Sequence, residues 1–367
     1  MPTALPLMDR ALALAARALT LSNPNPRVGC VIATAGGEVL GEGFTQQAGG
    51  AHAEVMALRD AATRGHDVRG ATAYVTLEPC AHQGRTGPCC DALAAAGVAH
   101  VIASIADPNP LVAGQGFARL RAAGVRVDVG AGADATRELN IGFFSRMQRG
   151  LPWMRLKAAT SLDGATALAN GTSQWITGEA ARADTHAWRA RACAVVTGIG
   201  TVLADDPLLN VRGVDTPRQP HLVIVDSQLR TPPTARLWGV PGRQIWIAHA
   251  SQADSPAAQA LQARGAQLVA LPGADGQVDL AALLRWLAQQ LQVNELHVEA
   301  GQRLNGAFIA HRLVDELLLY LAPTLLGSGA MGLASWGPLT RLDQGLALHW
   351  HSVERVGADL RVLARTR

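Results

Sequence analysis

The sequence has little cysteine, few aromatic residues and almost no excess of charge, and each shortage excludes a class of protein. Five cysteines in 367 residues are too few, and odd in number, for a secreted disulfide scaffold. Aromatic residues make up 4% and the net charge is +3, whereas binders of single-stranded nucleic acid need basic grooves and stacking platforms. No segment approaches the roughly 18 uncharged apolar residues of a membrane span, and residues 1–20 lack a signal-peptide pattern. We expect a cytoplasmic protein without a nucleic-acid or membrane partner.

The chain has enough apolar residues to fold, and its length suits two domains. Hydrophobic residues make up 49% and charged residues 17% of the sequence, the opposite of the balance in disordered chains. In the first part, apolar periodicity and turn residues predict strands and helices in alternation. The strands are expected at residues 28–33, 39–44, 72–77, 101–105 and 125–129, and the helices at 7–20, 52–64, 88–96, 117–123 and 133–149.

The pattern restarts near Gly150 and Pro152, which follow the basic end of the last of these helices. We therefore expect one domain over residues 1–149 and a second over residues 150–367. In the second, strands are expected at residues 153–158, 194–197, 221–225, 244–248, 267–271, 295–299 and 316–321, and helices at 178–192, 257–264 and 280–291. Strands alternating with helices indicate mixed α/β domains, each with helices on the faces of a sheet.

A metal-binding pattern lies in the first domain. His52 opens an expected helix, Cys80 follows the end of a strand, and Cys89 opens another helix after Pro88. A catalytic zinc ion takes three such ligands and leaves its fourth position to water. Glu54, two residues after His52, can accept a proton from that water and deliver it to a leaving ammonia. His-x-Glu followed by Pro-Cys-x-x-Cys is the pattern of zinc deaminases, and here the two cysteines are nine residues apart rather than three. The pattern predicts Zn²⁺ as a cofactor and Glu54 as the catalytic residue.

The remaining cysteines and the segment between the two ligand cysteines leave alternatives. A closed structural zinc would need Cys90 as a fourth ligand, but adjacent helical residues point about 100° apart, so Cys90 is expected to be a packed thiol. Cys30 and Cys193 are expected to be structural. The insert at residues 81–88, with His82 and Arg85, is either a solvated loop or a recognition element for an anionic substrate group.

Four longer motifs are present: NPNPRVGC at residues 23–30, HAE at 52–54, TLEPCAHQGRTGPC at 76–89 and DPNPLVAG at 107–114. Together they resemble the RibD family of bifunctional riboflavin biosynthesis proteins. That family joins a pyrimidine deaminase to a 5-amino-6-(5-phosphoribosylamino)uracil reductase. The resemblance covers almost the whole chain and implies a cytidine-deaminase-like α/β/α domain followed by a dihydrofolate-reductase-like α/β domain.

The resemblance also implies residue roles in the deaminase half. The zinc ligands would be His52, Cys80 and Cys89, with Glu54 as the proton shuttle. The ring and phosphate of the substrate would contact Asn23, His82, Arg85, Asp107 and Asn109. The chain departs from the usual family pattern at Ala81, Gln83 and Gly87, which affects the expected details of substrate contact but not the metal.

Glycine-bearing turns after strands distinguish the second half. Residues 197–201 and 299–307 each follow an expected strand, and a glycine loop that opens a helix presents backbone N–H groups to phosphate; alone, such loops are equally well explained as tight turns. Motifs at residues 157–164, 173–177, 201–207 and 298–301 resemble the family's reductase. The resemblance implies that NADP(H) contacts Ala159, Trp175, Thr201, Asp205, Ser227, Gly301, Gln302, Arg303, Leu304, Asn305, Gly306 and Ala307. The reductase substrate would contact Ser173, Arg189, Leu209, Arg212 and Glu299.

The resemblance implies deamination of a phosphoribosylated diaminopyrimidine followed by NADPH reduction of its ribosyl group. The alternatives are a deaminase of nucleic-acid bases, which the composition disfavours, and a nucleotide sensor in which zinc is structural. The alternative for Arg189 and Arg212 is that they are ordinary surface arginines. The alternative for Trp175 is that it is a core aromatic residue. The sequence names no general acid for the reduction. We expect a homo-oligomer if the second domain exposes an apolar face.

Overall fold

The computed structural model describes residues 4–81, 87–110, 112–252 and 255–367. Contacts between Cα atoms divide the chain into two compact units, Met1–Gly150 and Leu151–Arg367. Each unit has its own apolar core. None of the described helices is long and apolar enough to cross a membrane.

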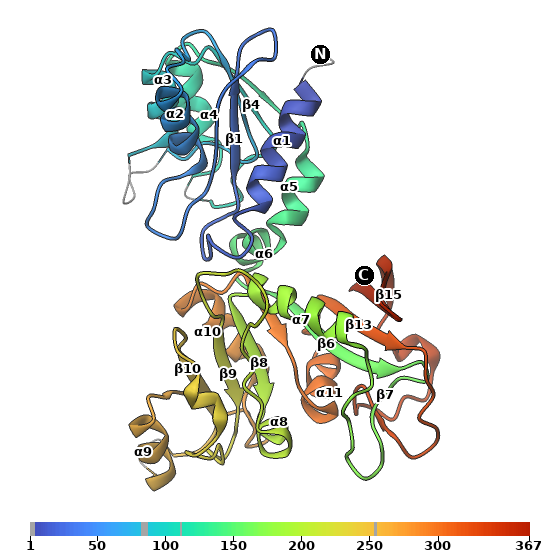
Figure 1. The fold of residues 1–367 in the computed structure, drawn as a ribbon. Helices are drawn as coiled ribbons and strands as arrows, with labels where there is room; N and C mark the ends of the chain where they lie inside the picture. Colours follow the sequence, from blue (N-terminus) through green and yellow to red (C-terminus); the bar gives the residue numbers. More distant parts are fainter. Residues whose placement is uncertain (1–3, 82–86, 111, 253–254) are drawn as a thin grey trace. The chain divides into compact units, whose positions relative to one another are not determined.

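The first unit is a five-stranded sheet between two helical layers (Figure 1). The strand order is β2 (Val39–Phe44), β1 (Gly29–Ala33), β3 (Thr72–Val75), β4 (His100–Ala103), β5 (Arg126–Val129). Strand β1 runs antiparallel to both of its neighbours, whereas β3, β4 and β5 are parallel. One face is covered by α2 (Ala53–Thr63), α3 (Cys89–Ala95) and α4 (Gln115–Ala122), and the other by α1 (Ala4–Ala16) and α5 (Ala133–Leu139).

Two glycines of β2 allow α2 to pack closely on the sheet. A Cβ at Gly41 would lie 2.3 Å from the carbonyl oxygen of Ala57, and one at Gly43 would lie 2.5 Å from the Cβ of Met56. Such separations are far below van der Waals contact, so any larger residue would push the helix outward. Because α2 begins directly after His52, this packing sets how close His52 and Glu54 lie to the sheet.

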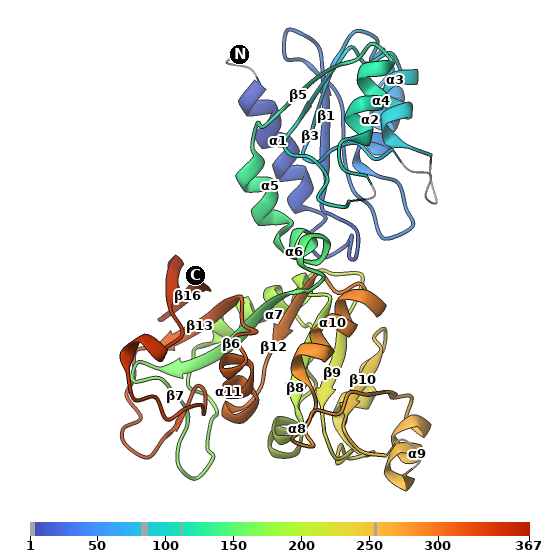
Figure 2. The same cartoon turned by 180° about the vertical axis from the view of Figure 1, so that it is seen from behind.

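The second unit contains a nine-stranded sheet (Figure 2). Its order is β11 (Gln267–Ala270), β10 (Ile245–His249), β9 (His221–Val225), β8 (Ala194–Gly198), β12 (Glu295–Val298), β6 (Trp153–Ser161), β13 (Glu316–Ala322), β16 (Asp359–Thr366), β15 (Leu348–Val356). The first seven strands are parallel, and β16 runs antiparallel to both of its neighbours, β13 and β15. Strands β7 (Ala165–Ala167) and β14 (Met331–Gly332) form a small separate ribbon.

Helices cover both faces of this sheet. Alternate residues of the parallel strands belong to different apolar clusters: Val196 packs with α10 (Leu280–Gln290) and α11 (Gln302–Ala310), whereas Val195 packs with α9 (Pro256–Ala263). The other helices are α7 (Glu179–Arg191), α8 (Ile199–Asp205) and the short 3₁₀ turns η1 (Arg236–Gly239) and η2 (Leu342–Gln344). Strands buried on both faces read as continuous apolar runs.

Two expectations about the elements were wrong, and some elements were not expected. The helix expected over residues 133–149 is two helices, α5 and α6 (Ile141–Arg149), because Asn140 leaves the helical path. Its side chain accepts the backbone N–H of Arg27 at 2.7 Å and donates to the Arg27 carbonyl oxygen at 2.9 Å. The first helix ends at Ala16, four residues before the expected end. The α8 helix and the antiparallel pair β15–β16 were not expected.

Candidate functional site

The first candidate site lies where α2, α3 and the turn after β3 meet. His52 is the N-cap of α2, Cys89 is the first residue of α3, and Cys80 lies in the preceding turn. His52 Nδ1 is 3.6 Å from the sulfur of Cys80 and 3.4 Å from that of Cys89. All three ligand atoms lie within 4.8 Å of one another. The expected convergence of these residues is therefore present.

The spacing of these atoms fits a tetrahedral zinc ion. Zinc lies about 2.3 Å from thiolate sulfur and about 2.0 Å from imidazole nitrogen, so tetrahedral angles place nitrogen and sulfur roughly 3.5 Å apart. The observed separations of 3.6 and 3.4 Å match that requirement. Among the described residues the group has three members, and Cys90 instead packs in the core with its thiol directed to Asp91. Three protein ligands leave the fourth position open.

The protonation of the two thiols also suits a metal site. A hydrogen bond from Cys89, aided by His52, lowers the pKa of Cys80 to about 4. The same bond to Cys80, together with burial, raises the pKa of Cys89. The hydrogen bond to Cys80 also raises the pKa of His52. A bound zinc ion would favour the deprotonated form of both thiols, because cysteine binds zinc as the thiolate.

Glu54 stands beside the ligands as a buried carboxyl group. Its side chain is 3% exposed, and Cys89 is a hydrogen-bond neighbour. Burial, and then the negative charge of Cys80, raise the pKa of Glu54 to about 7. A carboxyl group with a pKa near neutrality can both accept and donate a proton during a reaction.

The residues expected to contact the deaminase substrate are partly described. Asn23 lies in the turn after α1, and Asp107 and Asn109 lie in the loop between β4 and α4. The carboxylate of Asp107 accepts the backbone N–H of Asn109 at 2.8 Å. His82, Gln83 and Arg85 lie outside the described residues. Of the positions where the sequence departs from the family pattern, Ala81 is buried and Gly87 is exposed.

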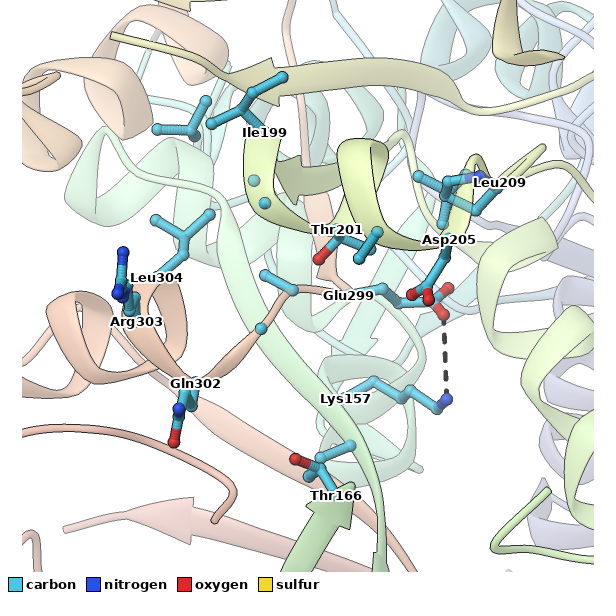
Figure 3. A pocket seen from close by; sticks show the side chains of 18 of the residues that line it. Lys157, Thr166, Ile199, Thr201, Asp205, Leu209, Glu299, Gln302, Arg303 and Leu304 are labelled. Carbon is cyan, nitrogen blue, oxygen red and sulfur yellow. Dashed lines mark ion pairs between the residues drawn. The ribbon is translucent and has the colours of Figure 1, made fainter. Parts of the chain in front are cut away.

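The second candidate site is a cavity of about 2060 Å³ lined by residues of the second unit. Binding sites for single small molecules commonly span about 300–1,000 Å³, so this cavity has room for a dinucleotide and a second ligand. It lies where parallel strands of the sheet end: α8 begins directly after β8, and α11 shortly after β12. Figure 3 shows Thr201 and Asp205 on one of these helices and Gln302, Arg303 and Leu304 on the other.

Both of these helices begin next to glycine. The N-cap residues are Gly198 and Gly301, and neither helix has a side-chain cap. First-turn N–H groups of such helices can bind phosphate. A Cβ at Gly198 would lie 3.2 Å from Leu304, so glycine lets the two helix starts approach each other.

A buried charged cluster stands in the cavity wall. The Arg189 guanidinium donates two hydrogen bonds to the Glu299 carboxylate, the one from Nη2 at 2.8 Å. Lys157 Nζ lies 3.8 Å from Glu299 (Figure 3), and His297 Nε2 lies 3.3 Å from it. Burial favours a raised pKa for Glu299, but the charge of Arg189 holds the pKa well below its usual range. Burial lowers the pKa of Lys157.

Most residues expected to bind NADP(H) or the reductase substrate line this cavity. They are Ala159, Ser173, Trp175, Arg189, Thr201, Asp205, Leu209, Arg212, Ser227, Glu299, Gly301, Gln302, Arg303, Leu304 and Ala307. Trp175 is 70% exposed beneath the guanidinium of Arg182, so it is not a core aromatic. Arg189 is not an ordinary surface arginine, because its side chain is 13% exposed.

Two expected cofactor residues are placed differently. The Asn305 side chain is 1% exposed and donates to the carbonyl oxygens of Ala300 and Leu333. A Cβ at Gly306 would lie 1.9 Å from the carbonyl oxygen of Ser335. Neither residue is part of the cavity lining. Both hold α11 against the chain that follows β14.

Sequence reasoning missed several ionisable residues of the cavity. Lys157, Arg182, His186, Arg230 and Arg236 also line it. Burial, followed by the charges of Arg189 and of Arg212, lowers the pKa of His186 to about 4. Lys157 opens the motif at residues 157–164, which was the available signal for it. Arg182 lies in α7, whereas Arg230 and Arg236 lie much later in the chain, so no short sequence window contained all three arginines.

Known proteins with the same architecture match both halves of the chain. Residues 1–105 match the cytidine and deoxycytidylate deaminase zinc-binding region, and residues 152–362 match the RibD C-terminal domain. The riboflavin biosynthesis protein RibD of Escherichia coli is 45% identical, with 96% of each chain covered. That of Haemophilus influenzae is 42% identical, with 97% of this chain and 95% of the relative covered.

Solved structures agree over the full length. RibD of Acinetobacter baumannii is 41% identical with a TM-score of 0.91, and 100% of this chain and 99% of that chain are covered. A deaminase/5-amino-6-(5-phosphoribosylamino)uracil reductase of Thermotoga maritima is 30% identical with a TM-score of 0.87 at the same coverage. A zinc-binding deaminase domain followed by a reductase domain that uses NADP(H) identifies the chain as a member of the RibD family of bifunctional riboflavin biosynthesis enzymes.

Proposed function

We propose that residues 1–149 deaminate diaminohydroxyphosphoribosylaminopyrimidine and that residues 150–367 reduce the ribosyl group of the resulting 5-amino-6-(5-phosphoribosylamino)uracil to ribityl. The observation that carries this proposal is the convergence of His52, Cys80 and Cys89 within 4.8 Å, beside the buried carboxyl group of Glu54. The large cavity with two glycine-capped helix starts in the second unit supports the reductase half.

In the deaminase half, zinc bound by His52, Cys80 and Cys89 would supply a water molecule activated for attack on the amine-bearing ring carbon. Glu54 is the catalytic residue: its carboxylate accepts a proton from that water and delivers it to the leaving amine, so that water is consumed and ammonia released. Its burial beside Cys80 supports this role. Asp107 and Asn109, with Asn23, would orient the substrate, and His82 and Arg85 would contact its phosphate.

In the reductase half, NADPH would supply the hydride, and the protein would align it with C1 of the ribose. The helix starts after Gly198 and Gly301 would bind phosphate groups of the cofactor. Arg189 and Arg212 would bind the substrate phosphate, since a guanidinium group can make two parallel bonds to it. Trp175, exposed on the cavity wall, would contact the cofactor. The other cofactor and substrate residues are those named above that line the cavity.

We also propose a homo-oligomer and a cytoplasmic location. Strand β15 is the edge of the large sheet and exposes Trp350 and Val353, which are 73% and 55% exposed. Exposed apolar edge strands pair readily with another chain. All five cysteines are free thiols, as in reducing compartments. Light scattering of the purified protein at several concentrations measures the oligomeric state, and a monomer throughout would contradict the first of these proposals.

The test is one assay with two signals. The purified chain, zinc and NADPH are mixed with the phosphoribosylated diaminopyrimidine, and ammonia release and NADPH absorbance are followed together. We expect equal amounts of ammonia released and NADPH consumed. Glu54→Gln should stop both signals, but NADPH consumption should return when the deaminated uracil compound is supplied directly. Ammonia release without NADPH loss would refute the reductase assignment, and ammonia release by Glu54→Gln at the wild-type rate would refute the deaminase mechanism.

A further inference from the structure

Glu78 is a buried carboxylate in the turn that carries the zinc ligand Cys80. Its side chain is 4% exposed, and its oxygens accept four backbone N–H groups. Oε2 accepts those of Asp107 and Gly114 at 3.1 and 2.9 Å, and Oε1 those of Gly116 and Phe117 at 2.9 and 3.3 Å. Each oxygen therefore serves two N–H donors of the chain segment that leads from β4 into α4.

The four backbone N–H donors stabilise the charge of this carboxylate, because hydrogen bonds to an ionised acceptor are of the stronger kind. Removing such a group from water is costly unless its lone pairs are satisfied. A carboxylate is the side chain that can accept from four donors at once, because both of its oxygens are acceptors and neither carries hydrogen.

Further contacts join the same two segments. The backbone N–H of Glu78 donates to the carbonyl oxygen of Ile105 at 3.0 Å. Arg119 of α4 donates to the carbonyl oxygen of Ala81 at 2.6 Å. Position 116 must be glycine for this approach, since a Cβ there would lie 1.9 Å from the carbonyl oxygen of Pro79. Hydrogen bonds to the segment between β4 and α4 therefore hold the chain on both sides of Cys80.

The segment between β4 and α4, which is hydrogen-bonded to Glu78, includes residues that the proposed function places at the substrate. Asp107 donates its N–H to Glu78 and accepts the N–H of Asn109 on its own carboxylate. A change at Glu78 therefore reaches Asn109 through Asp107 by two consecutive hydrogen bonds. Glu78 itself touches neither the three metal-ligand atoms nor Glu54 in any described contact.

From these contacts we propose that Glu78 is a positioning residue of the deaminase: it sets the location of Asp107 and Asn109 relative to the metal site. This rests on the proposed function, because that function makes Asp107 and Asn109 substrate contacts. Contacts between this loop and the substrate stabilise the bound ground state and the transition state equally. Because of this, their loss raises KM and leaves kcat nearly unchanged.

The test uses Glu78→Gln in the full chain loaded with zinc. Glutamine has the same shape, but its NH₂ group faces two of the four N–H donors and cannot accept from them. We expect KM for deamination to rise about 10- to 100-fold, as for the loss of hydrogen bonds to a charged group, while kcat changes by less than about three-fold. Zinc content and reductase activity should stay at wild-type values. An unchanged KM would overturn the proposal.

Two controls separate positioning from general loss of structure. Asp60→Asn alters a carboxylate of the same unit that accepts the backbone N–H of Glu42 at 2.9 Å, away from the metal ligands, and should leave KM unchanged. A purely structural role for Glu78 would lower the active fraction, and hence kcat, without a change in KM. Glu78→Asp keeps both acceptor oxygens and should give a smaller rise in KM than Glu78→Gln; it also serves as the test should Glu78→Gln fail to fold.

Amide hydrogen exchange provides a readout that does not depend on activity. In Glu78→Gln, peptides that cover residues 105–118 should exchange faster than in the wild type, whereas peptides of α2 should not. Unchanged protection of residues 105–118 would overturn the proposed link even if turnover fell. A wild-type chain that carried zinc but released no ammonia would instead refute the proposed function and leave this exchange experiment valid.

Discussion

Replacing Glu54 with glutamine should abolish deamination and, at the same time, stabilise the metal-free protein. General acid–base groups commonly contribute about 10²- to 10⁴-fold to a reaction rate, and we expect a loss of that order with zinc still bound. Glutamine matches the shape of the protonated carboxyl group and carries no charge. The stability gain is the sharper prediction, because it follows from the burial of a single group.

The magnitude follows from the pKa of Glu54, which burial and the charge of Cys80 raise from 4.5 to about 7. Because the folded state holds this proton more tightly than the unfolded chain, the linked stability is fully present below about pH 4.5 and is lost as the pH rises through about 7. At about 1.4 kcal/mol per pH unit, the wild type loses roughly 3 kcal/mol by pH 8 and roughly 1 kcal/mol by pH 5. Glutamine does not titrate, so the variant avoids both losses.

The assay must report on the first unit alone. All eight tryptophans follow residue 150, so tryptophan fluorescence reports on the second unit. Protection of the backbone amides of β1 and β3 against hydrogen exchange, corrected for intrinsic rates, gives the free energy of opening of the first unit. Chelator-treated wild type and Glu54→Gln are compared at pH 5 and pH 8. An equal opening free energy of the two proteins at pH 8 would refute the reasoning.

Three further perturbations test the metal site and the second unit. Cys89→Ser should weaken zinc binding by at least about 100-fold, above the usual effect of outer partners; elemental analysis after dialysis against a chelator checks this, and retained zinc would contradict the ligand set. Arg155→Leu should cost about 3 kcal/mol in urea unfolding, the low end for breaking a buried ion pair, because Glu295 and Glu316 keep Arg191 and Arg365 as partners. Gly306→Ala, which forces a Cβ against the carbonyl oxygen of Ser335, should lower the melting temperature of the second unit without raising the Kd for NADPH in the fraction that remains folded; a raised Kd at an unchanged melting temperature would favour direct cofactor contact.

The sequence was sufficient to predict the strand and helix alternation and the convergence of His52, Cys80 and Cys89. Strands β1 and β2 around the Ala35–Gly37 turn, and helix α3 after Pro88, follow from local patterns of apolar and turn residues. His52, Cys80 and Cys89 were recognisable because thiols and imidazole at helix starts and strand ends are rare outside metal sites. The family motifs then related the second half to a reductase.

Contacts between distant segments were beyond the reach of local patterns. The break at Asn140 depends on hydrogen bonds to Arg27, 113 positions earlier in the chain. Strands β15 and β16 are stabilised by pairing with each other and with β13 rather than by a strong apolar alternation of their own. The charged cluster around Glu299 unites residues from β6, α7 and β12.

Glu78 shows most clearly the difference between what the sequence determines and what the tertiary structure decides. Its position in the motif Thr76–Cys80 was visible in the sequence, but its four N–H donors lie 29 to 39 residues later. The same holds for burial, which raises the pKa of Glu54 and is set by the packing of α2 on the sheet. The sequence by itself determined which atoms could bind a metal and carry a proton. Only the tertiary structure decided which backbone groups surround them, because that depends on how separate segments pack.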